Sequence, residues 1–173
     1  MLAIIGSLAV WVSAKIQVPF YPVPMTMQTL VVLGIGMAFG WRLGAATIAL
    51  YLFEGAVGLP VFAGTPEKGI GLGYLFGPTG GYLLGFIPAV MICGYLAERG
   101  WDRNVIKTGL AMLLGNFAIY GIGLLWLGTM IGWDKPILAW GLYPFMLGDG
   151  AKIVLEAIGL PVCWRLIRSV GDK

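Results

Sequence analysis

Two opposite charges lie inside the last long apolar stretch of the chain, in the segment GDGAK at residues 148–152. Charged side chains at membrane depth are costly, so they are rare, usually paired, and often functional. Asp149 and Lys152 are three residues apart and Glu156 follows four residues later, so all three share one face of a helix. The stripe is either a structural ion pair or the lining of a cavity that holds a polar ligand. Because aspartate accepts N–H groups and lysine donates three, we favour ligand binding.

The composition is that of a protein embedded in a membrane. Of the 173 residues, 59% are apolar and 11% are charged, whereas soluble domains carry roughly 25% charged residues. A chain of this length predicts one integral membrane domain, residues 1–173. The net charge of +3 is interpreted as basic cytoplasmic loops and not as a nucleic-acid site.

The residue types on which most enzymes and metal sites depend are absent or isolated. The chain has no histidine, which excludes His-based metal sites and Ser-His-Asp triads. No lysine directly follows a glycine, so a P-loop for ATP is missing. Cys93 and Cys163 both lie in apolar stretches, and neither their number nor their spacing suggests a disulfide framework or a zinc site. We therefore expect no enzyme, no metal and no cofactor.

Apolar runs predict an all-α membrane protein with six transmembrane helices and long outward-facing loops that form a substrate pocket. The first run could be mistaken for a signal peptide, but no basic residue precedes it and five more runs follow, so we expect a retained helix. The second and third runs are shorter than the roughly 20 residues of a full span, so they should form a short hairpin. The expected helices cover residues 2–18, 26–39, 43–58, 105–127 and 144–167, with the fourth helix entered through residues 77–82 and ending near residue 96.

Three loops between these helices have unusual compositions. Residues 19–24 hold three prolines, residues 59–78 interleave glycines with aromatic residues, and residues 133–143 contain the aromatic residues Trp133, Trp140 and Tyr143. Irregular backbone at membrane depth is tolerated only against protein or a water-filled cavity, so the glycine-rich loop is expected to be a lid or wall over a site. Thr79, at its end, is a plausible N-cap of the next helix.

Counting basic residues sets the orientation. The side that follows the even-numbered helices carries seven lysines and arginines, and the other side carries three, so both termini should be cytoplasmic in the cell membrane. The seven are Arg42, Arg99, Arg103, Lys107, Arg165, Arg168 and Lys173, and the three are Lys15, Lys68 and Lys135.

This orientation brings distant polar residues to one outward-facing pocket. Gln28, Tyr82 and Asp149 lie near the outer ends of their helices, and Lys152 is one turn deeper. Asn116, in the middle of the fifth helix, is a weaker candidate, because a lone mid-helix asparagine often only bonds a neighbouring helix.

Four motifs, in order, resemble the BioY family, the biotin-specific substrate-binding (S) components of energy-coupling factor (ECF) transporters. The resemblance implies capture of biotin from outside, with uptake driven by a transmembrane coupling subunit and two cytoplasmic ATPases. It also implies ligand contacts at Asp149 and Lys152, with Gln28, Tyr82 and Asn116 as further candidates. The motifs are PVP at residues 22–24 with QTL at 28–30, GLPVFAG at 58–64, GPTGGY at 77–82 with Gly85 and Phe86, and Gly148, Asp149 and Lys152.

Small residues four apart on the first helix are, by the same resemblance, the expected docking positions for the coupling subunit. The two candidate pairs are Ala3 with Ser7 and Ala9 with Ser13, and the sequence does not choose between them.

Two carboxylates depart from the expected pattern. Glu54 could face the outer loops, and Glu156 could pair with Lys152 and so weaken its role toward a ligand. Alternative functions are an S component for another vitamin, or a proton-coupled carrier or channel in which Asp149, Lys152 and Glu156 form a relay.

Overall fold

Helices dominate the computed structural model, which describes residues 1–67 and 69–171, with side chains as far as Arg165. The described side chains therefore leave out three residues of the basic-residue count, namely Lys68, Arg168 and Lys173. The elements are α1 (Leu2–Lys15), β1 (Gln17–Val18), β2 (Met25–Thr26), α2 (Gln28–Ala56), α3 (Leu72–Leu75), α4 (Gly80–Ala97), the 3-10 helix η1 (Trp101–Arg103), α5 (Val105–Ile131), α6 (Ile137–Gly141) and α7 (Tyr143–Gly171).

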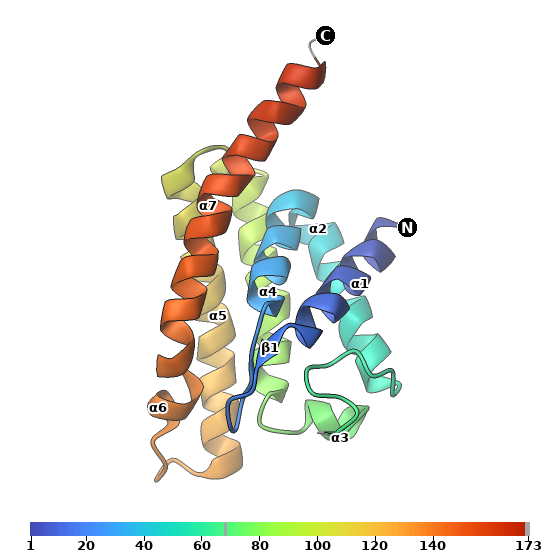
Figure 1. Ribbon diagram of the computed structural model, residues 1–173, viewed down its shortest axis with the longest axis vertical. Helices are drawn as coiled ribbons and strands as arrows, with labels where there is room; N and C mark the ends of the chain where they lie inside the picture. Colours follow the sequence, from blue (N-terminus) through green and yellow to red (C-terminus); the bar gives the residue numbers. More distant parts are fainter. Residues whose placement is uncertain (68, 172–173) are drawn as a thin grey trace.

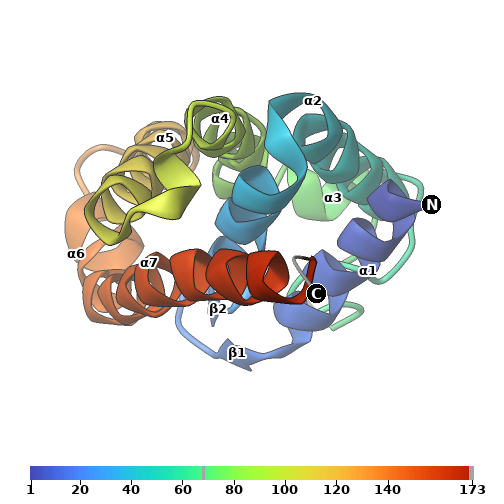
Figure 2. The ribbon, with the colours of Figure 1, turned by 90° about the horizontal axis from the view of Figure 1, so that it is seen from above.

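Helix α4 is the centre of the bundle. It packs against α2 on one side and α5 on the other, while α1 packs on α2 and α7 packs on α5 (Figure 1, Figure 2). Glycines allow these helices to approach closely, since a Cβ on Gly85 of α4 would lie 2.9 Å from the Cα of Ile119 on α5. Close packing through small residues is typical of helices associating in a membrane.

Helix α2 is two helical arms joined at Gly40. This residue has φ of 75°, a left-handed value that glycine adopts without a steric penalty. A Cβ on Gly44 would lie 3.6 Å from the Cα of Gly36, although these residues are eight apart in sequence, so the second arm folds back along the first. The predicted hairpin is confirmed, and with α1, α4, α5 and α7 its two arms make the six predicted helices.

The surface of the bundle has the apolar character that lipid requires. Leu8 on α1, Phe117 on α5 and Leu155 on α7 are all exposed. By length and composition, Gly80–Ala97 and Val105–Ile131 can cross a membrane, as can Gln28–Ala56 when its two arms are counted together, and α1 is a shorter apolar helix. An all-α membrane protein is therefore confirmed.

The loops expected to face outward gather at one end of the molecule. The β1–β2 hairpin, α3 and α6 lie together at the lower end in Figure 1, and the turn between the two arms of α2 lies toward the opposite end. The hairpin was not predicted. The chain leaves α1 at Ile16 in an extended conformation, so the helix ends three residues before the expected position, and Gln17 and Val18 pair with Thr26 and Met25.

The glycine-rich loop forms a wall that is fixed to the bundle. Lys15 at the end of α1 donates hydrogen bonds to the carbonyls of Pro60 at 2.7 Å and Phe62 at 3.1 Å. Tyr51 of α2 donates to the carbonyl of Val61 at 3.0 Å. Val61, Phe62 and Ala63 are buried.

Helix capping differs from the prediction in one place. Thr79 precedes α4 as expected, but its side chain makes no capping hydrogen bond, because it has a helical and not an extended conformation. The side chain of Asn104 caps α5, where its oxygen accepts from the amides of Ile106 at 3.0 Å and Lys107 at 3.2 Å.

The small residues of α1 that are the predicted docking positions mostly face inward, and docking itself stays a prediction. Ser7 and Ser13 are buried, and Ser7 donates a hydrogen bond to the carboxylate of Glu54 on α2. Ala3 is half-buried and Ala9 is exposed. Neither predicted pair presents two free residues to a partner, because the small-residue face is used by α2 of the same chain.

Replacing Gly94 by alanine is expected to lower the melting temperature by several degrees. A Cβ there would lie 2.3 Å from the amide nitrogen of Trp41 and 2.4 Å from the carbonyl carbon of Gly40. Backbone atoms cannot rotate away, and overpacking typically costs about 1–3 kcal/mol. Gly121→Ala is the matched control, because a Cβ there meets nothing within 4 Å. Equal melting temperatures for the two variants would contradict this packing.

Candidate ligand-binding site

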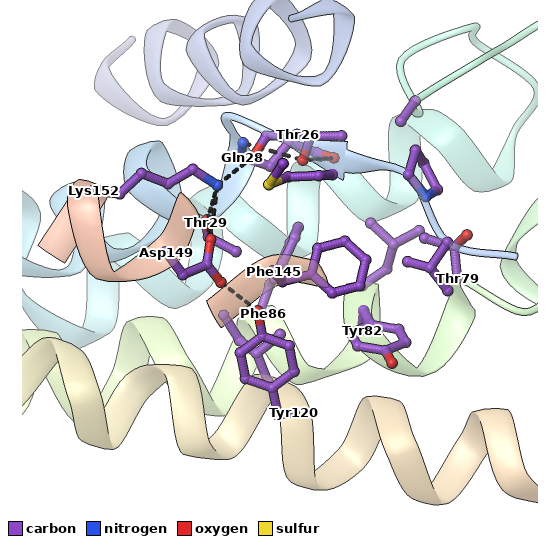
Figure 3. A pocket seen from close by; sticks show the side chains of 16 residues that line it. Thr26, Gln28, Thr29, Thr79, Tyr82, Phe86, Tyr120, Phe145, Asp149 and Lys152 are labelled. Atoms are coloured by element: carbon purple, nitrogen blue, oxygen red, sulfur yellow. Dashed lines mark hydrogen bonds and ion pairs between the residues drawn. The ribbon is translucent and has the colours of Figure 1, made fainter. Parts of the chain in front are cut away.

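Asp149 and Lys152 form a buried ion pair on α7. The ammonium of Lys152 lies 2.8 Å from Oδ1 of Asp149, and the two side chains are 11% and 8% exposed. The same ammonium donates to the carbonyl of Thr26 at 2.6 Å and to the hydroxyl of Thr29 at 2.9 Å (Figure 3). All three donors of the ammonium are therefore satisfied by the protein.

The carboxylate of Asp149 is held as completely as the ammonium. The hydroxyl of Thr29 donates to Oδ1 at 3.0 Å, and the hydroxyl of Tyr120 on α5 donates to Oδ2. The network joins α2, α5 and α7 (Figure 3). Each charge offsets part of the desolvation cost of the other.

A small cavity lies beside the pair. Its volume is about 40 Å³, far below the roughly 300–1,000 Å³ typical of small-molecule sites. One wall carries polar groups of Asp149, Lys152, Thr29 and Gln28. The remaining walls are mainly apolar and aromatic, with Val23, Ala63, Tyr82, Leu83, Phe86, Ile119, Tyr120 and Phe145 among them.

The structure brings together four of the five predicted ligand-site residues. Gln28, Tyr82, Asp149 and Lys152 line this single cavity. The amide of Gln28 donates to the hydroxyl of Tyr51 at 2.9 Å, and the hydroxyl of Tyr82 donates to the carbonyl of Gly141 at 2.9 Å. These bonds fix both side chains, so Tyr82 offers the cavity its ring rather than a free hydroxyl.

Asn116 does not line the cavity. It is buried in α5, and its side-chain oxygen has no hydrogen-bond partner among the described residues. It lies four residues before Tyr120, so the two share a helix face at different depths. Asn116 is therefore the one predicted ligand-site residue outside this cavity, and its contact with a ligand stays a prediction.

Two carboxylates do not make the contacts that the sequence left open for them. Glu156 forms no ion pair with Lys152 among the described residues, and its Oε1 lies beside Gly34 of α2. Lys152 is therefore held by Asp149 and not by Glu156. Glu54 faces Ser7 on α1 and not the outer loops.

Three contributors to the network were missed by sequence reasoning. Tyr120 had a signal, since it follows Asn116 by one helical turn and completes a polar stripe on an otherwise apolar helix. Thr29 also had a signal, since it stands in the QTL motif at residues 28–30. Thr26 contributes a main-chain carbonyl, which sequence does not mark.

Residues 1–169 of the chain match the BioY family. The chain belongs to the BioY family. This member is 37% identical over 147 residues to a probable biotin transporter BioY of Pyrococcus horikoshii, covering 85% of this chain and 84% of that protein. It is 36% identical to the biotin transporter BioY of Thermotoga maritima, with coverage of 85% and 84%. It is 37% identical to the biotin transporter BioY of Rhodobacter capsulatus, with coverage of 90% and 88%.

A solved structure has the same fold as this BioY family member. It is a crystal structure of the S-component for biotin from an ECF-type ABC transporter. The TM-score is 0.80, with 95% of this chain and 89% of the other chain covered, at 21% sequence identity. The relatives are named as transporters, which confirms the prediction that the chain is not an enzyme.

Proposed function

We propose that this protein captures biotin from outside the cell as the S component of an ECF-type vitamin transporter. The observation that carries the proposal is the buried Asp149–Lys152 pair, which lies beside an apolar and aromatic cavity at the loop-covered end of the bundle. Small-molecule sites are typically apolar enclosures with a few well-placed polar groups. Membership of the BioY family and the named functions of the relatives support biotin as the ligand.

The ureido group of biotin fits this pair. A ureido carbonyl stands between two N–H groups, so it offers an acceptor and donors side by side. The pair offers the complementary arrangement, an acceptor on Asp149 and a donor on Lys152, 2.8 Å apart. We therefore assign both side chains to the ureido ring, with Tyr82, Phe86 and Phe145 enclosing the rest of the ligand.

Ligand entry requires a wall of the cavity to move. The 40 Å³ of the cavity are too few for the two fused rings of biotin. A second hollow of about 410 Å³ lies next to it, and Met25, Thr26 and Lys152 line both spaces. The strand β2 carries Met25 and Thr26, so its displacement joins the two spaces. The Thr26 carbonyl then moves away from Lys152, and one N–H of the ammonium becomes free for the ligand.

The proposed assembly places both termini in the cytoplasm and adds a transmembrane coupling subunit and two ATPases. The exposed apolar face of α1, with Ile5, Leu8, Ala9 and Val12, is our candidate for the coupling surface. This chain alone in liposomes is expected to bind biotin without accumulating it. Accumulation without partner subunits, driven by a proton gradient, would instead identify a proton-coupled carrier.

Calorimetric titration of the purified chain with biotin, thiamin and riboflavin tests the ligand. We expect saturable binding of biotin and none of the other two, because thiamin and riboflavin lack a ureido group flanked by an aliphatic tail. Preferential binding of thiamin or riboflavin would reject biotin and identify an S component for another vitamin.

A further inference from the structure

A third concave surface lies away from both the ligand-binding cavity and the hollow next to it, at the Gly40 turn of α2. It is a groove of about 520 Å³, within the range of small-molecule sites. Side chains from α2, α4 and α5 form it: Trp41, Met91, Ile92, Tyr95, Leu96 and Leu114. We call these six residues the Trp41 groove. None of them lines the cavity beside Asp149.

The guanidinium groups of two arginines lie over aromatic rings of the Trp41 groove. The guanidinium carbon of Arg42 lies 5.1 Å from the centre of the Trp41 ring, and that of Arg99 lies 3.4 Å from the centre of the Tyr95 ring. Both arginines are exposed, and neither forms an ion pair with any described residue. Arg99 uses one donor on the carbonyl of Tyr95 at 3.1 Å, so most donors of both side chains remain available.

The backbone segments that carry the two arginines are in contact. A Cβ on Gly94 would lie 2.3 Å from the nitrogen of Trp41, so the start of the second α2 arm touches the last turn of α4. The nearby carboxylate of Glu98 accepts the amide of Trp41 at 3.3 Å and lies against Gly40. The Glu98 carboxylate thus faces the backbone turn. The rim of the groove carries this one acidic group and the two arginines, so its net charge is positive.

We propose that the Trp41 groove binds an anionic phospholipid. An acyl chain occupies the apolar groove, and the phosphate meets Arg42 and Arg99 at its rim. The charge of the rim favours a lipid with net negative charge over a zwitterionic one, because each basic residue near a membrane surface adds about 1 kcal/mol of attraction. Trp41 and Tyr95 are the amphipathic rings that favour the depth of the headgroups. The proposal is independent of which vitamin the protein carries.

Quenching of Trp41 fluorescence by brominated lipids tests the proposal. The full chain is placed in bilayers that contain dibrominated phosphatidylglycerol or dibrominated phosphatidylcholine at equal mole fractions. The signal of Trp41 is isolated by subtracting the spectrum of Trp41→Phe, since the chain has seven tryptophans. We expect half-maximal quenching at about tenfold lower mole fraction of the anionic lipid.

The double variant R42Q/R99Q is expected to remove this preference and leave quenching by phosphatidylcholine unchanged. The matched control is K135Q/R165Q, which loses the same charge at exposed positions outside the groove and should keep the preference. In the wild-type protein, 1 M salt should reduce the preference through screening, which tests the charge without any variant. Equal quenching by both lipids, or a preference that survives R42Q/R99Q, would overturn the proposal. The proposal would also be overturned if the wild-type protein showed no lipid selectivity and R42Q/R99Q lost binding of the coupling subunit. The groove would then be a protein interface.

Discussion

Asp149→Asn is expected to weaken biotin binding by at least about a hundredfold. The substitution keeps the size of the side chain but turns one acceptor into an NH₂ group that faces either the ammonium of Lys152 or the hydroxyl of Tyr120. Removing one partner of a buried ion pair typically costs about 3–5 kcal/mol, because the other charge remains buried and uncompensated. Isothermal titration calorimetry on the purified protein measures the change in Kd.

Two variants separate this effect from general damage. Tyr120→Phe removes only the hydroxyl that donates to Asp149, and about a tenfold loss is expected, as for one hydrogen bond to a charged group. Asp134→Asn breaks the exposed pair with Lys135, where side chains are 73% and 50% exposed, and should leave Kd unchanged. If Asp149→Asn lowers the melting temperature but binds biotin normally, the pair is structural and the proposed function loses its main support.

The helical architecture could be predicted from the sequence because membrane burial leaves a strong compositional signal. Long apolar runs set the positions of α2, α4, α5 and α7, and the Gly40 turn was recognisable as a break between two short runs. The count of basic residues predicted that three loops lie on one side of the membrane, next to the helix ends that carry Gln28, Tyr82, Asp149 and Lys152. In the structure these four residues line one cavity.

The missed features depend on contacts between segments far apart in sequence. The β1–β2 pairing consists of two residues per strand, too few for any alternation to be visible. The closure of the site by the Thr26 carbonyl follows from that pairing and could not be inferred without it. The inward direction of Ser7 and Ser13 was also hidden, because α1 is apolar on every side and its packing face is chosen by α2.

The partners of Lys152 illustrate how helix spacing alone is insufficient. Asp149 and Glu156 lie on the same face of α7, three residues before Lys152 and four residues after it, so spacing allowed either carboxylate to hold the ammonium. Thr26 and Thr29 decide between them, since both accept from Lys152 at the level of Asp149. The ammonium is thereby directed toward the cavity.

Diaminobiotin, in which two amines replace the ureido ring, is expected to bind roughly 10⁴-fold more weakly than biotin. A site built around hydrogen bonds to one group rejects an analogue without that group by factors of this size, because its buried polar atoms lose their partners. The amines also carry positive charge toward Lys152, whose ammonium is 2.8 Å from Asp149. Competition against labelled biotin measures the ratio.

Dethiobiotin and biotin methyl ester assign the polar contacts by comparison. Dethiobiotin keeps the ureido ring and carboxylate and loses only the sulfur, so its Kd should rise by less than about tenfold, in line with the loss of a small apolar contact. The methyl ester keeps the ureido ring but loses the negative charge. If Lys152 serves the ureido oxygen, the ester binds nearly as well as biotin. A loss for the ester as large as that for diaminobiotin would place the ammonium at the carboxylate instead, and the ligand would then lie in the cavity in the opposite direction.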